Sequence, residues 1–356
     1  MRTLAVVGGG AVGLAIAWRA AEAGWTVTVY DPEPALGASY VAGGMLAPLS
    51  EGWPGEDRVL AFGAAALEQW PAFAESLQKI SGESMFVADE TLTAALDSAD
   101  ADNLYMVLGW LAAFGHQLQV LERAEVRALE PALARSVRAA LYAKTEPAID
   151  NRRVLRALYK ACAGVEIRME TVVALDDLPH DRIILAAGAH SAELWPGLPV
   201  RPVKGEILRL RHRPGVRPPP TRVIRARVHG RQVYLVPRED GIVVGATQYE
   251  AGFDTTVTVG GVRDLIADAE TILPGIAEYE LAEASAGSRP GTPDNLPLLG
   301  HLDDRVIAAT GHGRNGMLTL ALTATLIPQL LDGTVSPIAE LASPQRFPAL
   351  SPGGVR

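Results

Sequence analysis

The glycine-rich stretch at the start of the chain constrains the fold more than any other part of the sequence. An apolar run leads into Gly8, Gly10 and Gly13, a helical pattern follows, and a second apolar run ends on Asp31. The Gly-x-Gly-x-x-Gly spacing permits a tight turn, the approach of a pyrophosphate to the backbone, and close packing of helix on strand. The helix would direct its free N–H groups and positive dipole end at the phosphates. The stretch predicts a βαβ unit that binds a dinucleotide, with Asp31 on the adenosine ribose, and leaves the identity of the dinucleotide open.

The rest of the chain alternates between two patterns. Buried strands such as residues 181–187, and the strand–loop–helix segment 305–331, repeat the character of the first βαβ unit. Residues 202–248 instead carry alternating strands, two of them joined at Asp240-Gly241, a strong hairpin signal. A chain of 356 residues is long enough for two domains. The sequence predicts an α/β fold in which an antiparallel-sheet (α+β) domain is inserted into a Rossmann-like nucleotide-binding domain.

Small residues are concentrated in further segments. Residues 32–48 are rich in Gly and Ala, and a predicted strand ends in Ala-Ala-Gly at Gly188. Both segments predict backbone laid closely against a ligand. β-branched residues predict strand material over 165–175. A Gly- and Pro-rich segment begins near Ala284, where the antiparallel sheet is predicted to end.

Apolar spacing predicts three helices in the first half of the chain. They cover residues 58–80, 102–115 and 152–163. Asn151 is placed to cap the third helix, because an Asn side chain can accept a hydrogen bond from a free N–H group of the first turn.

Composition limits the possible partners. The formal net charge of −9 and the pI near 5.4 argue against a nucleic-acid partner, because phosphate contacts need clustered Lys and Arg. No apolar run reaches the roughly 18 residues of a membrane span, and the first strand begins without a preceding signal segment. We therefore expect no nucleic-acid partner, no membrane association and a cytoplasmic location.

The single cysteine and the histidines give no indication of a metal site. Cys162 has no partner for a disulfide and excludes a cysteine-based zinc site. It lies in a helical run, where a buried small apolar residue is expected rather than a nucleophile. His301 and His312 are not at metal-ligand spacing with another His or a carboxylate pair. We expect no metal.

Five ordered motifs resemble the FAD-dependent D-amino acid oxidase superfamily. They are GGGAVG, ASYVAGGMLAP, YLVPRED…GIVVGATQ, GSRPGTPDNLPLLG and TGHGRNGM, and they span almost the whole chain. Within the superfamily the chain is most similar to the glycine oxidases of thiamine biosynthesis. The resemblance implies an FAD-binding domain and a substrate domain. The boundaries expected in chain order are 1–80 (FAD-binding), 81–145 (substrate), 146–199 (FAD-binding), 200–284 (substrate), 285–335 (FAD-binding) and 336–356 (C-terminal tail).

The resemblance also implies the reaction. Glycine or another small amine would be oxidised to its imine, which is released as glyoxylate and ammonia, while O2 is reduced to H2O2. The imine of glycine would supply the thiazole part of thiamine. No Ser/His/Asp constellation indicates a strong base beside the substrate carbon. FAD is expected to be non-covalent, because Cys162 lies outside all five motifs. A homo-oligomer is possible.

Four residues match the substrate site of the superfamily. Arg289 matches the arginine that holds the substrate carboxylate, since a planar guanidinium can bind both oxygens. Tyr234 matches a tyrosine whose hydroxyl lines the pocket. Gln248 falls at a variable position that is commonly apolar, which leaves the size and polarity of the substrate open. Arg314 would add positive charge near the flavin or contact substrate; a salt-bridged surface arginine is the alternative.

The residues implied to contact FAD come from the glycine-rich loop, the small-residue segments and the last motif. A helix starting near Met317 would direct its N-terminus at the flavin N1–C2=O region, where negative charge gathers on reduction. The implied set is Gly8, Gly10, Ala11, Val12, Gly13, Asp31, Pro32, Ala38, Ser39, Gly43, Gly44, Met45, Val173, Ala187, Gly188, His312, Gly313, Arg314, Asn315, Gly316, Met317 and Leu318.

Several other functions remain open at this point. Within the superfamily they are a D-amino acid oxidase or dehydrogenase and a sarcosine-type oxidase. An NAD-dependent dehydrogenase is disfavoured by the two glycine-rich flavin segments beyond the N-terminal unit. A flavin-binding module without turnover is the non-enzymatic alternative, and the presence of Arg289 and Tyr234 argues against it.

Overall fold

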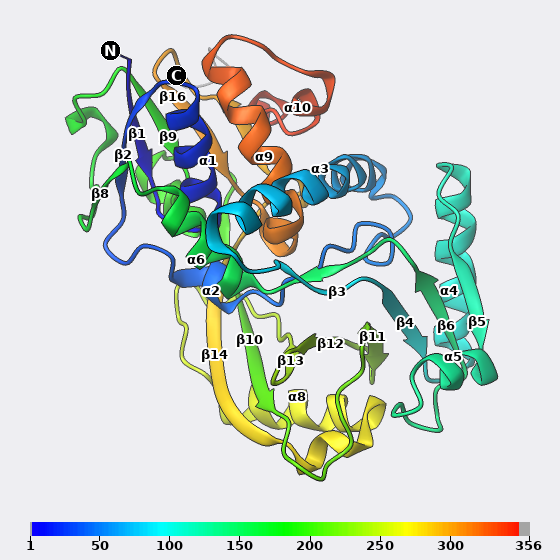
Figure 1. The fold of residues 1–356 in the computed structure, drawn as a ribbon. Helices are drawn as coiled ribbons and strands as arrows, with labels where there is room; N and C mark the ends of the chain where they lie inside the picture. Colours follow the sequence, from blue (N-terminus) through cyan, green and yellow to red (C-terminus); the bar gives the residue numbers. More distant parts are fainter. Residues whose placement is uncertain (1, 349–356) are drawn as a thin grey trace.

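A computed structural model describes residues 2–348, and its two main sheets lie one above the other in the view of Figure 1. The upper sheet has six strands in the order β15-β16-β9-β1-β2-β8. Its strands pair in parallel except β15, which runs antiparallel to β16. Their bounds are β1 Thr3–Val7, β2 Thr26–Tyr30, β8 Glu166–Arg168, β9 Arg182–Leu185, β15 Leu298–His301 and β16 Val306–Thr310.

The six-stranded sheet is buried on both faces. Successive strand residues point to opposite faces, so Leu4 and Val6 of β1 join one apolar cluster while Ala5 and Val7 join another. The first cluster is covered by helices α1 Ala11–Glu22, α3 Asp57–Ser81, α6 Asn151–Ala161 and α9 Gly316–Leu331. Helix α9 is apolar on most sides because it packs between α1 and α3. Trp70 of α3 donates from Nε1 to the carbonyl oxygen of Leu318, 2.8 Å away.

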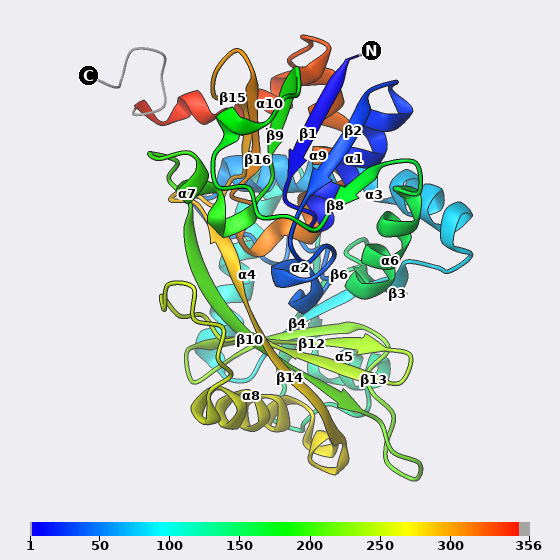
Figure 2. The same cartoon turned by 90° about the vertical axis from the view of Figure 1, so that its left-hand side faces the viewer.

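The lower sheet has eight strands in the order β14-β10-β13-β12-β11-β4-β6-β5. All neighbours are antiparallel except β11 and β4. Figure 2 shows β10 and β14 rising together from this sheet toward the six-stranded one. The bounds are β4 Thr91–Ala95, β5 Gln119–Glu122, β6 Ala139–Ala143, β10 Arg201–Arg211, β11 Val223–Val228, β12 Arg231–Arg238, β13 Gly241–Gly245 and β14 Glu280–Gly291.

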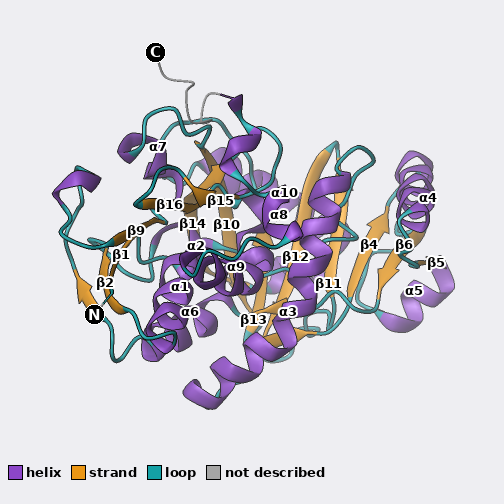
Figure 3. Cartoon of the chain, turned by 90° about the horizontal axis from the view of Figure 1, so that it is seen from above, coloured by secondary structure: helices purple, strands orange, loops and turns teal. Residues whose placement is uncertain are grey.

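Helices cover the eight-stranded sheet on the side away from the six-stranded one. Leu265 and Ala269 of α8 (Val259–Ile272) pack with Leu208 and Leu235 of the sheet. Figure 3 shows α4 (Ser98–Ala113) and α5 (Arg123–Leu129) beside β5 and β6, at the end far from the N-terminus. The smaller elements are α2 Gly37–Val41, β3 Phe86–Ala88, β7 Ala148–Ile149, α7 Ser191–Leu194 and α10 Pro337–Leu341.

The predicted α/β class, with a parallel sheet and a largely antiparallel one, is confirmed. The helix predicted over 58–80 is α3. The helix predicted over 102–115 begins earlier, because the Asp97 side chain accepts a hydrogen bond from the Asp100 N–H and caps α4. None of the helices within residues 2–348 is both long enough and apolar enough to cross a membrane.

The predicted cap of α6 was wrong by one residue. Asp150 is the cap: its Oδ1 accepts from the N–H groups of Arg152 and Arg153, at 2.9 and 3.1 Å. Asn151 is the first helical residue, and its buried Nδ2 donates to the carbonyl oxygens of Ser39 and Tyr40 in α2. Asn151 therefore ties α6 to α2.

Two strand predictions also differ from the structure. Strand material predicted over 165–175 is limited to β8, and Val173 lies outside it with 81% of its surface exposed. The antiparallel sheet does not end near Ala284. Strand β14 continues to Gly291 because its Ala, Ser and Gly residues pair with β10, so the expected boundary between residues 284 and 285 falls inside a strand. Part of the expected tail, residues 349–356, lies outside the described residues.

Candidate active site

A cavity of about 1470 Å³ is lined by residues at the ends of β1, β9 and β16 of the six-stranded sheet and by residues of β12, β14 and α8. The carboxyl ends of parallel strands are where open α/β sheets bind ligands. Three residues of the expected site do not line the cavity, namely Gly13, Asn315 and Leu318. Those that do are Gly8, Gly10, Ala11, Val12, Asp31, Pro32, Ala38, Ser39, Gly43, Gly44, Met45, Val173, Ala187, Gly188, Tyr234, Gln248, Arg289, His312, Gly313, Arg314, Gly316 and Met317.

Gly8 and Gly13, which follow β1, each have to be glycine for a different geometric reason. Gly8 has φ +110°, and a Cβ there would overlap the carbonyl group of Ala186 on β9's side. A Cβ at Gly13 would overlap the carbonyl oxygen of Gly8. Gly13 thus lets α1 pack on the loop after β1 from outside the cavity, which is the packing role that the spacing predicts.

The N-terminus of α1 is open toward the cavity. Gly10 occupies the cap position and has no side chain with which to cap the helix. The Ala11 N–H donates to Ser39 Oγ, 3.1 Å away. Asp31 steadies the same loop: its Oδ2 accepts from the Gly9 N–H at 2.5 Å, and its Oδ1 accepts from the Glu33 N–H at 2.8 Å. Free N–H groups and the helix dipole make this place suited to an anionic group.

Tyr234 of β12 lies in a slot between two glycines. A Cβ at Gly43 would be 2.7 Å from the Tyr234 ring, and one at Gly245 would overlap it. Burial raises the pKa of Tyr234, so the phenol keeps its proton at neutral pH and can donate a hydrogen bond. The two glycines therefore set the position of one hydrogen-bond donor in the cavity.

Arg289 lies on a strand, not in a loop. It is paired with Val203 of β10, and its guanidinium lies over Gly205, where any side chain would collide with it. Its Nη1 donates to the carbonyl oxygen of Thr247, 3.2 Å away. Within residues 2–348 no carboxylate forms an ion pair with Arg289. Its remaining N–H groups are therefore available for a bound anion.

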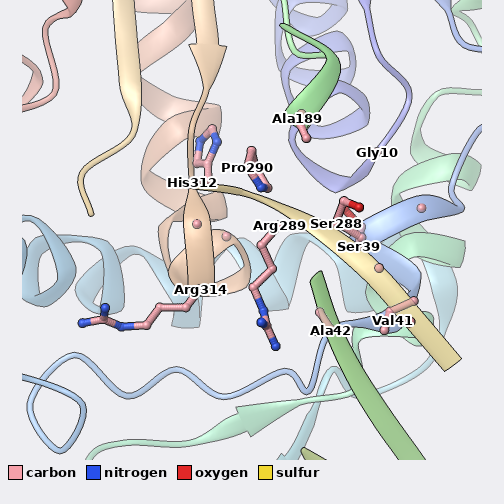
Figure 4. Close-up of a pocket in the computed structure, with 18 of the residues that line it drawn as sticks. Gly10, Ser39, Val41, Ala42, Ala189, Ser288, Arg289, Pro290, His312 and Arg314 are labelled. Atoms are coloured by element: carbon pink, nitrogen blue, oxygen red, sulfur yellow. The ribbon is translucent and has the colours of Figure 1, made fainter. Parts of the chain in front are cut away.

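Arg314 has a different environment. Its Nη2 donates to Glu56 Oε2, 2.8 Å away. Figure 4 shows its side chain turned away from that of Arg289. Arg314 is thus salt-bridged, and it also lines the cavity. Gln248 lines the cavity with an exposed side chain.

The segment before α9 supplies the other end of the cavity. His312 is buried, and its Nε2 lies 3.2 Å from Thr323 Oγ1. Burial lowers the pKa of His312 to about 4, so the imidazole is neutral at pH 7. Helix α9 begins at Gly316 without a side-chain cap, and its N-terminal residues Gly316 and Met317 line the cavity.

The sequence motifs did not point to some other residues that line the cavity. Glu51 and Arg225 line the cavity and form an ion pair, with Glu51 Oε1 3.2 Å from Arg225 Nη2. Phe253 also lines it and stacks on His190, with ring centroids 4.2 Å apart. An arginine among apolar residues of a strand, as in TRVIRARV, was the available signal for Arg225. No local pattern marked Glu51 or Phe253.

Residues 3–330 match the family of FAD dependent oxidoreductases. The chain belongs to this family. It is 31% identical to the bifunctional protein ThiO/ThiG of Synechocystis sp., over 96% of this chain and 53% of that relative. It is 30% identical to a glycine oxidase of Pseudomonas aeruginosa, over 92% of this chain and 94% of that protein. The chain spans about half the length of the bifunctional relatives that it matches.

A solved structure supports the same placement. The crystal structure of glycine oxidase from Geobacillus kaustophilus superposes with a TM-score of 0.88 at 28% identity, covering 98% of this chain and 100% of that chain. FAD is the cofactor of the FAD-dependent oxidoreductases, and the cavity fits it. The N-termini of α1 and α9 both open on the cavity, and Gly8 and Gly10 line it without side chains of their own.

Proposed function

We propose that this FAD-dependent oxidoreductase is an amino acid oxidase that acts on glycine or another small amine. Glycine, O2 and water would give glyoxylate, ammonia and H2O2, by way of the imine. The observation that carries the proposal is the Arg289 guanidinium, which faces the cavity beside the protonated phenol of Tyr234 and has no carboxylate partner among residues 2–348. An anionic substrate group completes this arrangement.

The residues of this chain bind and orient the substrate. Arg289 holds the carboxylate, and the Tyr234 hydroxyl donates a hydrogen bond beside it. Holding the substrate at one end fixes the direction of its Cα–H bond, and such orientation is a large part of catalysis. FAD, when bound, would supply the two-electron redox chemistry that couples oxidation of the substrate to reduction of O2. The N-terminus of α1 with Ser39 would hold the anionic pyrophosphate, and the N-terminus of α9 would lie at the flavin ring.

The relatives support glycine as the substrate. Two of them are named for glycine oxidation or for thiamine biosynthesis: the P. aeruginosa glycine oxidase, and a putative thiamine biosynthesis oxidoreductase of Rhizobium etli, 32% identical over 89% of this chain. On this basis, the imine formed from glycine supplies the thiazole part of thiamine.

Peroxide production tests the proposal. The purified yellow protein is assayed with glycine, sarcosine and D-alanine at equal concentrations in air, and H2O2 and ammonia are measured. Glycine is expected to give the highest kcat/KM. A higher kcat/KM with D-alanine or sarcosine would move the assignment to a D-amino acid or sarcosine-type oxidase. No peroxide with any of the three would leave a dehydrogenase if one of them bleaches the flavin in the absence of O2, and a flavin-binding module if none does.

A further inference from the structure

Three large side chains lie on the cavity-facing side of the eight-stranded sheet. Arg225 of β11 is paired directly with Tyr234 of β12, which is paired with Gly245 of β13. Paired residues point to the same face, with Cβ atoms about 4.5–5.5 Å apart. Arg289 reaches onto this face from β14, across the bare position at Gly205 of β10. Tyr234 therefore lies between Arg225 on one side and Arg289 on the other.

Glu51 adds a negative charge on the Arg225 side. Its Oε1 is 3.2 Å from Arg225 Nη2, and both residues line the cavity. No described residue donates a hydrogen bond to the second carboxylate oxygen. The pKa of Tyr234 is raised mainly by burial; the Arg289 guanidinium opposes the rise, and the Glu51 carboxylate adds to it. A positive and a negative group are thus both within electrostatic range of one hydroxyl.

The backbone that carries Glu51 is held by two buried charged residues. The Glu146 carboxylate accepts from the N–H groups of Leu49 and Ser50. Arg225 donates from Nη1 to the carbonyl oxygen of Ser50. Glu146 has no exposed surface and Arg225 is 9% exposed. Glu51 is therefore presented to the cavity on a fixed turn, although residues 46–52 form no regular helix or strand.

We propose that Glu51 is a specificity-determining residue that binds the amine of the substrate while Arg289 binds its carboxylate. The proposal deepens the amino acid oxidase function and rests on it. An α-amino acid carries a cationic or hydrogen-donating nitrogen one carbon from its carboxylate, and the two charged groups on either side of Tyr234 match that pattern. A carboxylic acid without an amine would bind through Arg289 alone.

The test compares glycine with acetate, which has the carboxylate but no amine. The variant Glu51→Gln keeps the size of the side chain and removes its charge. In the absence of O2, the dissociation constant of glycine is taken from the concentration dependence of the rate at which it bleaches the flavin. That of acetate is taken from the change in the visible flavin spectrum of the holoenzyme. A hydrogen bond to a charged group contributes about 1.5–3 kcal/mol, so glycine binding should weaken about 10- to 100-fold. Acetate binding should change less than about twofold.

Two further variants separate this role from a structural one. Glu283→Gln removes another arginine-paired glutamate, whose partner is Arg152 and which does not line the cavity, so both dissociation constants should stay at the wild-type values. Glu51→Asp keeps the charge and should restore part of the affinity for glycine. If Glu51→Gln does not fold, Glu51→Asp alone must show weaker binding of glycine, by a smaller factor, with binding of acetate unchanged.

The outcomes distinguish this inference from the proposed function. Equal weakening of glycine and acetate, or no weakening of glycine, would overturn the role of Glu51. Failure of the wild-type enzyme to oxidise glycine would instead overturn the proposed substrate. In that case glycine does not bleach the flavin, so its binding is read from the flavin spectrum as for acetate, and the ratio of glycine to acetate binding still decides the role of Glu51.

Discussion

The part of the cavity formed by β1, α1 and α2, here called the nucleotide half, is lined largely by backbone and small side chains. The part formed by β11, β12 and β14, here called the substrate half, is lined by Arg225, Tyr234 and Arg289. In the nucleotide half the binding groups are N–H donors that any sequence with the right glycines can present. In the substrate half they are charged side chains, and each needs a neighbouring residue that leaves room or fixes its position.

A substitution at Gly13 should have the largest effect, and it tests the nucleotide half. In Gly13→Val the side chain would collide with the carbonyl oxygen of Gly8, so α1 could not pack beside β1. We expect a loss of more than about 3 kcal/mol in the free energy of unfolding and little bound flavin. The flavin-to-protein absorbance ratio measures the bound flavin, and urea unfolding measures the free energy of unfolding.

The matched control is Gly109→Ala, on the exposed side of α4, where a Cβ meets nothing within 4 Å. It should bind flavin normally and gain about 0.5–1 kcal/mol, since Ala favours a helix over Gly. A Gly13→Val protein with full flavin content and normal stability would contradict the packing role.

Removal of the Arg289 guanidinium should have the next largest effect, and it should be confined to the substrate half. Truncating one partner of a buried charge pair costs about 2–5 kcal/mol, so kcat/KM for glycine in Arg289→Ala should fall at least about 30-fold. The flavin should stay bound, because none of the N–H groups of the nucleotide half is altered. Steady-state peroxide assays measure kcat/KM, and the flavin spectrum shows whether the cofactor stays bound. Unchanged kcat/KM would remove Arg289 from the site.

Two buried titratable residues near the cavity, His312 and Glu146, should make stability depend on pH with opposite signs. His312 has its pKa lowered from 6.5 to about 4 by burial, so its contribution to stability is present above pH 6.5 and is lost as the pH falls through 4. Glu146 has its pKa raised from 4.5 to about 7, chiefly by burial, so its contribution is present below pH 4.5 and is lost as the pH rises through 7.

Each effect amounts to at most about 3.5 kcal/mol, at about 1.4 kcal/mol for each pKa unit. Urea unfolding of wild type, His312→Gln and Glu146→Gln between pH 4 and pH 8 measures them. As the pH is lowered, the free energy of unfolding of wild type should fall relative to that of His312→Gln. As the pH is raised, it should fall relative to that of Glu146→Gln. Shifts in the same direction would contradict the assigned protonation states.

Cys162 should have the smallest effect. Its thiol is buried outside the cavity, its Sγ lies 3.4 Å from the carbonyl oxygen of Leu14, and burial raises its pKa to about 12. A protonated thiol in this place is not a nucleophile toward flavin. Acid precipitation should release all of the flavin into the supernatant, from wild type and from Cys162→Ala alike. Flavin that remains in the precipitate would show covalent attachment.

The nucleotide half was largely predictable because its determinants are local. The spacing of Gly8, Gly10 and Gly13 specifies a turn, a close approach and a packing contact within six residues, and the structure contains the turn and the packing contact at Gly8 and Gly13. The start of α6 was missed by one residue because Asp150 and Asn151 are both good caps, and only the position of α2 favours one of them.

The substrate half was predictable only where a motif marked it. The antiparallel sheet was predicted to end near Ala284, inside β14, because Ala, Ser and Gly are poor strand formers. The pairing of β14 with β10 overrides that preference. The partner of Arg314 is Glu56, and the partner of Glu51 is Arg225, 174 positions further along the chain. Pairings over such separations depend on the register of strands and leave no periodic signal in the sequence.

The most direct test of the central claim is the reaction of the bound flavin with glycine when O2 is absent. The account predicts that glycine bleaches the yellow absorbance of the wild-type holoenzyme completely, with glyoxylate and ammonia formed in a one-to-one ratio to flavin. Admission of O2 should restore the colour and yield an equal amount of H2O2. A flavin that stays yellow at saturating glycine would contradict the assignment of glycine as the substrate, whether or not D-alanine or sarcosine bleaches it.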